Sequence, residues 1–158
     1  MNVLFPQNPM MRKLPEPVFE AEFDAAKSLG NTCFLYDEEA LSSGDFDGAF
    51  KNLPPGNRSQ LLYRGWIVTE EVYQQFREAL SARCYSLVSL AAQYAEVTYF
   101  PNYYPKIREL SPNAVWTETP DSYLAWSLSR KLGDGPFVIC LLYTSRAHET
   151  KANLVCRL

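Results

Sequence analysis

The chain has 158 residues, of which 47% are hydrophobic and 14% aromatic, enough for the core of one small domain or of one and a half. Three of its 15 basic residues and one of its 18 acidic residues lie in 140–158, so residues 1–139 hold 12 bases and 17 acids, a net charge of −5. We do not expect nucleic acid as a partner, because a net negative charge repels a polyanion. Pro6 and Pro9 interrupt the opening apolar run, so no secretory signal is predicted, and no run approaches the roughly 18 to 20 apolar residues of a membrane span. We expect a soluble, cytoplasmic protein with no membrane contact.

Short apolar runs predict four strands in the first part of the chain. They lie at residues 2–6, 32–37, 60–65 and 84–89. Helical patterns separate the first strand from the second and the third from the fourth, which is typical of a parallel α/β sheet. We therefore expect a small Rossmann-like α/β domain over residues 1–89.

Two helices are predicted between these strands. Phe19, Phe23 and Ala26 recur at helical spacing, and Gly30 is the expected carboxyl-terminal cap. Thr69 is the expected amino-terminal cap of the other helix. Its apolar face is formed by Val72, Phe76, Ala79 and Leu80. Residues 41–59 are rich in Ser, Gly, Pro and Asp and predict a loop with at most one helical turn.

The pattern changes after residue 89, and a second, incomplete domain is expected over residues 90–139. Two short helices separated by Pro101 come first, and a brief strand is predicted at 114–118. Thr119 and Pro120 predict the start of a further helix, which runs to Gly133. Its apolar stripe consists of Leu124, Leu128 and Leu132. The run "GPFVI" at 135–139 then predicts one more strand.

Residues 140–158 resemble a translated sequencing-library adapter. The pieces "CLLYTS", "RAHET" and "NLVCRL" match successive parts of such an adapter, in the same order and spacing. Taken alone, "CLLYTS" also has the composition of a β-strand, but a strand does not explain the order of the pieces that follow. We expect a non-native tail after Ile139.

Cysteine and histidine usage excludes several kinds of site from residues 1–139. Only Cys33 and Cys84 lie there, which predicts neither a disulfide framework nor a cysteine-rich metal site and fits a reducing compartment. The single histidine, His148, lies in the tail. No catalytic triad and no histidine metal centre can be assembled without it, so we name no catalytic residue and no metal ligand.

The order of motifs resembles the front part of a bacterial or phage ATP-grasp protein. It runs from "LLYRGWIVT" through "YFPNYYP" and "VWTE" to a proline-started helix and "LGDGPFVI". The resemblance implies a pre-ATP-grasp α/β domain at 1–89 and the beginning of the ATP-grasp amino-terminal lobe at 90–139. It also implies a parent ligase that uses ATP and Mg²⁺ to activate a small-molecule or peptide carboxylate for attack by an amine or another nucleophile.

The parts of that family that bind nucleotide would lie downstream of Ile139. Where the resemblance calls for a phosphate-binding lysine, this sequence has Cys140. A glycine-rich loop and magnesium-binding acids would follow still later. The fragment is therefore expected to be inactive alone and to bind no cofactor.

The segment "YRGW" is the most suggestive local site. Ligands of open parallel sheets lie outside the carboxyl ends of the strands, where Tyr63, Arg64 and Trp66 are expected to follow the third strand. Arg64 or Trp66 would meet a substrate carboxylate or phosphate there. The alternative is structural: Trp66 covers a sheet edge, and Arg64 pairs with an acid.

Two weaker candidates remain open. Lys106 and Arg108 lie near aromatic residues, and the resemblance implies that a basic residue here helps to bind nucleotide, although a solvated helix face explains them more readily. The acids Asp37, Glu38, Glu39, Asp45 and Asp47 lack the register of a calcium-binding EF-hand and predict an exposed loop.

The sequence is thus compatible with three functions. The chain is the truncated amino-terminal part of an ATP-grasp ligase, or a non-catalytic α/β binding or interaction module, or a complete protein that ends with its tail as written. The gene sequence beyond the codon for Ile139 would separate these alternatives.

Overall fold

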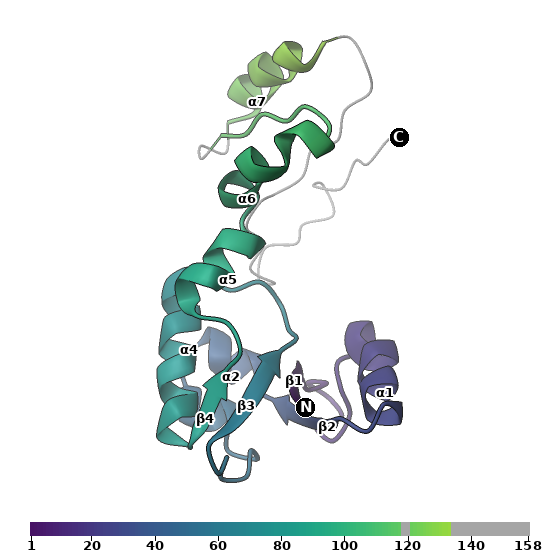
Figure 1. The fold of residues 1–158 in the computed structure, drawn as a ribbon, viewed down its shortest axis with the longest axis vertical. Helices are drawn as coiled ribbons and strands as arrows, with labels where there is room; N and C mark the ends of the chain where they lie inside the picture. Colours follow the sequence, from purple (N-terminus) through teal and green to yellow (C-terminus); the bar gives the residue numbers. More distant parts are fainter. Residues whose placement is uncertain (118–120, 134–158) are drawn as a thin grey trace. The chain divides into compact units, whose positions relative to one another are not determined.

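The computed structural model of the chain describes residues 1–117 and 121–133 (Figure 1). The chain divides into two compact units, Met1–Ala95 and the residues from Glu96 onward. The division falls within helix α5 (Ala91–Thr98). The predicted strand at 135–139, the tail at 140–158 and the predicted helix start at Thr119 and Pro120 lie outside the described residues.

The first unit is built on a four-stranded, all-parallel sheet, which confirms the α/β prediction. Its strands are β1 (Asn2–Pro6), β2 (Thr32–Tyr36), β3 (Ser59–Tyr63) and β4 (Tyr85–Leu87), in the spatial order β2-β1-β3-β4. Strand β1 is central and pairs with both β2 and β3. A central strand needs apolar residues on both of its sides, and "VLF" provides them.

The two faces of the sheet pack against different helices (Figure 1). Val3 and Phe5 of β1 point to the face covered by the 3₁₀-helix η1 (Pro17–Phe19) and by α1 (Glu20–Ser28), where they meet Phe19. Leu4 points to the opposite face and joins the larger core around Phe76 of α4 (Glu70–Ala82). Alternate residues of one strand thus belong to different cores, as the pleat requires.

The predicted ends of both long helices in this unit are confirmed. The backbone N–H of Val72 donates to the Thr69 hydroxyl at 3.3 Å, so Thr69 caps α4. Gly30 has φ +77° just after α1, a left-handed conformation that glycine adopts without strain.

The segment predicted as a loop contains more helix than expected. It includes part of α2 (Glu38–Ser42) and all of α3 (Phe46–Ala49). The Asp37 side chain accepts a hydrogen bond from Ala40 N, and Asp45 accepts one from Gly48 N. Each aspartate thus provides the amino-terminal cap that a short helix needs, and our prediction underestimated this pair of caps.

The described part of the second unit is helical. After the carboxyl end of α5 come α6 (Phe100–Ile107), η2 (Arg108–Leu110), α7 (Ser122–Ser129) and η3 (Arg130–Leu132). Pro101 lies in the first turn of α6, so the break predicted at this proline is confirmed. Helix α7 begins at Ser122 with Asp121 as its cap.

The brief strand predicted at 114–118 is wrong for its described residues, 114–117, which form no strand. The hydroxyl of the buried Tyr104 donates to Pro112 O at 3.1 Å and accepts from Ala114 N at 3.0 Å. A side chain therefore satisfies backbone groups that a neighbouring strand would otherwise bind.

Deleting residues 140–158 is expected to leave the free energy of unfolding in urea unchanged if these residues are a translated adapter, because such a segment would not have been selected to pack on this fold. Urea titrations of the full chain and of a chain ending at Ile139 test this expectation. A loss of more than about 2 kcal/mol on deletion would contradict the adapter interpretation, since losses of that size need a specific packing or polar contact.

Candidate functional site

The carboxyl ends of the strands form the edge of the sheet where a ligand is expected. The chain leaves β1 toward β2 and leaves β3 toward β4, so the connections from the neighbouring strands β1 and β3 depart in opposite directions. Open α/β sheets bind their ligands at such a reversal of direction. Residues 7–16 follow β1 and residues 64–69 follow β3, and both segments lie at this point.

Arg64 lies at the reversal and is bound by an acid of α1. Its backbone N–H donates to Leu4 O at 2.9 Å, which extends the pairing of β3 with β1 by one residue. Its Nε and Nη2 donate to the two carboxylate oxygens of Glu22, at 2.5 and 2.6 Å. The guanidinium carbon also lies 5.0 Å from the ring centroid of Phe19, within range of a cation–π contact. Both members of the ion pair are about half exposed, at 44% and 48% of their side-chain surface.

The two charges stabilise each other's ionised forms. Hydrogen bonds from Arg64 lower the pKa of Glu22, and the hydrogen bond to Glu22 raises the pKa of Arg64. The pair therefore stays ionised at a lower pH than an isolated glutamate would allow. Such an arginine presents a fixed fork of N–H donors, the geometry that suits a carboxylate or a phosphate.

Trp66 faces the same side of the sheet as Arg64. Its indole Nε1 donates to Glu16 at 2.7 Å, and its ring meets Phe19 edge to face with centroids 5.4 Å apart. Glu16 is buried, at 4% exposure. Trp66 thus connects the segment after β3 with the segment that leads into α1. These contacts are those of a side chain that covers the edge of the sheet, which was the structural alternative for Trp66.

Tyr63 points to the opposite face and belongs to a buried hydroxyl network. It donates to the backbone carbonyl of Trp66 at 2.7 Å and lies 3.1 Å from the hydroxyl of Tyr36, which donates to Glu38 at 2.7 Å. Burial is the main reason that the pKa values of Tyr36 and Tyr63 are raised well above the ordinary range. A ligand outside the sheet would therefore meet Arg64 before it met Tyr63.

Gly65 allows the backbone after β3 to pass close to the hydroxyl groups of this network. A Cβ at this position would come within 2.3 Å of the Tyr36 hydroxyl and 2.8 Å of the Tyr63 ring. Only glycine lets the backbone pass the two hydroxyls. The order "YRGW" thus places Tyr63 on one face of the sheet and Arg64 and Trp66 on the other, with glycine where the backbone approaches most closely.

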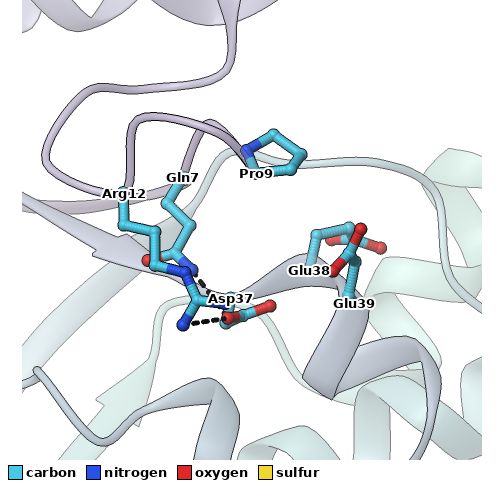
Figure 2. A pocket seen from close by; sticks show the side chains of 6 residues that line it. All are labelled: Gln7, Pro9, Arg12, Asp37, Glu38 and Glu39. Carbon is cyan, nitrogen blue, oxygen red and sulfur yellow. Dashed lines mark hydrogen bonds and ion pairs between the residues drawn. The ribbon is translucent and has the colours of Figure 1, made fainter.

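A hollow lies at the ends of β1 and β2 (Figure 2). Figure 2 shows Gln7 and Arg12 turned toward Asp37, with the carboxylates of Glu38 and Glu39 beyond it. Gln7 donates to Asp37 at 2.7 Å, and Arg12 lies 3.8 Å from the same carboxylate. The enclosed space is about 10 Å³, room for a single water, so the hollow as it stands does not fit a substrate.

The acids near this hollow do not form a metal site. Among residues 1–117 and 121–133, no group of three His, Cys, Asp or Glu side chains is arranged to hold a metal ion. Asp45 and Asp47, the other acids of that predicted cluster, lie at and just after the start of α3.

Lys106 and Arg108 belong to the second unit. Lys106, in the last turn of α6, forms an ion pair with Glu96 at 2.5 Å. Arg108 begins η2. Lys106 and Arg108 thus belong to a different unit from Arg64.

The partners of the predicted site residues were missed at the sequence level. Glu22, Glu16 and Phe19 all contact Arg64 or Trp66, and Gln7 and Arg12 line the hollow. The one available signal was the acidic first turn of α1, which in a parallel α/β fold begins near the carboxyl edge.

Comparison with known proteins identifies no relative. No family model matches the chain, and no curated protein or solved structure matches it significantly. The fold and the contacts above therefore define the class, a parallel α/β domain with an arginine at the edge where such sheets bind ligands. Within the described part of the chain, no helix is long and apolar enough to cross a membrane.

Proposed function

We propose that the chain supplies the substrate-binding α/β domain of an ATP-grasp ligase, in which Arg64 binds the carboxylate to be activated. The position of Arg64 carries the proposal: it presents a half-exposed fork at the point where β1 and β3 send the chain in opposite directions. The order of motifs from "LLYRGWIVT" to "LGDGPFVI" supports the family. In this proposal the activity requires an ATP-binding lobe in addition to this domain.

The chemistry of such a ligase divides between this domain and the remainder of the protein. Such a ligase would use ATP to activate a carboxylate for attack by an amine or another nucleophile, with ADP and phosphate as the other products. Cationic groups and Mg²⁺ neutralise the charge that develops on the phosphoryl group. This domain would contribute the orientation of the carboxylate.

The described residues do not fit the metal or the nucleotide. No group of three metal-binding side chains lies among the described residues, and the sequences "GNRS" and "LGDG" lack the pattern of a phosphate-binding loop. No step through Mg²⁺ or ATP is therefore assigned to the groups of this chain.

Isothermal titration of this chain with Mg²⁺-ATP is expected to give no saturable binding at micromolar concentrations. The physical reason is the net charge of −3 of the whole chain, together with the lack of a phosphate-loop pattern in its sequence. Tight stoichiometric binding would show that the nucleotide site lies within this chain and would contradict the division of labour proposed here.

The ligase proposal itself is tested on a protein in which the chain continues beyond Ile139 into its downstream part. That protein is expected to form ADP only when both a carboxylate and an amine or other nucleophile are present. ADP formation independent of any carboxylate, or none with a broad panel of carboxylates and amines, would contradict it.

A second candidate is a non-catalytic interaction module, and α7 favours it. Tyr123 and Trp126 are 76% and 55% exposed, and the Arg130 guanidinium lies 5.1 Å from the Trp126 ring centroid. Tyrosine, tryptophan and arginine are the residue types that contribute most to protein interfaces. This candidate predicts no carboxylate-dependent ADP formation.

A further inference from the structure

Arg64 is held along one edge only. Glu22 binds the edge formed by Nε and Nη2, and Phe19 lies against the guanidinium. Within the described residues, Nη1 has no hydrogen-bond or ion-pair partner, and the side chain keeps 44% of its surface exposed. The opposite edge, formed by Nη1 and the outer hydrogen of Nη2, is therefore open to an incoming group.

A guanidinium can bind a carboxylate along either edge, because each edge presents parallel N–H donors. A free arginine side chain loses much rotamer freedom when it binds a ligand. In this chain Glu22 and Phe19 have already fixed the guanidinium plane. A ligand that binds the open edge would not have to supply this ordering.

The charge of Glu22 also affects which ligand fits. Its carboxylate compensates the positive charge of Arg64, so the open edge attracts a ligand through the geometry of its hydrogen bonds more than through net charge. A carboxylate and a phosphate both match this fork, but with the charge of Arg64 compensated, the acidic chain disfavours the multiply charged phosphate more than a singly charged carboxylate.

We infer that Glu22 is a positioning residue for Arg64 and that the open Nη edge of Arg64 binds a carboxylate group. The inference rests on the proposed function and deepens it, because it names the edge of Arg64 that receives the carboxylate and the residue that orients that edge.

The test is a titration of the ¹⁵N-labelled 158-residue chain with propionate at constant ionic strength, followed through the side-chain signals of Arg64. Saturable changes are expected at the Nη groups, while the Nε–H signal keeps the position that marks its bond to Glu22. Glu22→Ala is expected to weaken propionate binding about tenfold, because the side chain must then be ordered by the ligand. Glu22→Gln retains an oxygen that accepts one hydrogen bond from Arg64 and should recover part of the loss.

Two controls separate positioning from a general effect on the fold. Asp47→Ala removes another arginine–carboxylate contact of this unit, between Arg83 and Asp47 at 3.3 Å, and should leave propionate binding unchanged. Inorganic phosphate should bind more weakly than propionate. The thermal unfolding midpoint should be nearly the same in the original chain and in all three variants.

Three results would overturn the inference. Tighter propionate binding in Glu22→Ala would show that Glu22 competes with the ligand. Equal weakening in Asp47→Ala would show a nonspecific effect. No saturable shift in the unaltered chain would show that the open edge is not a site. Because the titration needs no ATP, it fails separately from the ligase proposal, which is judged by carboxylate-dependent ADP formation.

Discussion

Replacing Phe76 by alanine is expected to lower the free energy of unfolding by about 3–5 kcal/mol, the usual cost of removing a buried aromatic ring. Phe76 is 0% exposed and lies at the centre of the larger core. Its ring stacks on Phe50 with centroids 5.2 Å apart and meets Tyr63 edge to face at 5.0 Å. The cavity left by alanine would remove these contacts, and urea unfolding of the two chains measures the loss.

The matched control is another aromatic residue on a helix, Tyr123→Ala. Tyr123 is 76% exposed, so its replacement should change the free energy of unfolding by no more than about 0.5 kcal/mol. A loss below about 1 kcal/mol for Phe76→Ala would show that α4 does not cover the sheet as described.

Arg64→Ala is expected to lower kcat/KM for the carboxylate substrate at least tenfold in the protein that contains the downstream lobe. This corresponds to about 1.4 kcal/mol of transition-state stabilisation. Arg64→Lys should recover only part of the loss, because an ammonium group does not reproduce a two-pronged contact. Steady-state kinetics with varied carboxylate at saturating ATP measure both variants.

Stability distinguishes this role from a structural one. Exposed ion pairs contribute only about 0.2–1 kcal/mol, so Arg64→Ala should leave the thermal midpoint nearly unchanged despite the loss of its contact with Glu22. Arg83→Ala, which breaks the similar pair with Asp47, should alter neither turnover nor stability. If Arg64→Ala unfolds the protein or leaves turnover intact, Arg64 is a structural partner of Glu22 and "YRGW" covers the sheet.

The strands and the alternation of the first unit could be predicted because each depends on local sequence. An apolar run such as "VLF" predicts a buried strand, and Thr69 and Gly30 mark helix ends through their own chemistry. The amount of helix after β2 was underestimated, because a composition rich in Ser, Gly, Pro and Asp suggested a loop, whereas two aspartates cap short helices. Over residues 114–117 no strand forms, and the backbone N–H of Ala114 donates instead to the hydroxyl of Tyr104, a residue outside that segment.

The candidate site was only half predictable, for a related reason. The carboxyl end of β3 was expected to present Arg64, but its partner Glu22 is 42 residues away in sequence, and Glu16, the partner of Trp66, is 50 residues away. Nothing in local spacing selects these two acids from the many in the chain. The two acids reach Arg64 and Trp66 because η1 and α1 pack on the sheet. In the same packing, the ring of Phe19 contacts both Arg64 and Trp66.

Membership of this chain in an ATP-grasp ligase is tested most directly by sequencing the gene from its source DNA across the codons for Gly135 to Leu158. We expect "GPFVI" to continue into a lysine and then a glycine-rich segment, in place of Cys140 and the residues that follow it. A gene that encodes "CLLYTSRAHETKANLVCRL" as written and then stops would contradict both the adapter interpretation and the ligase proposal.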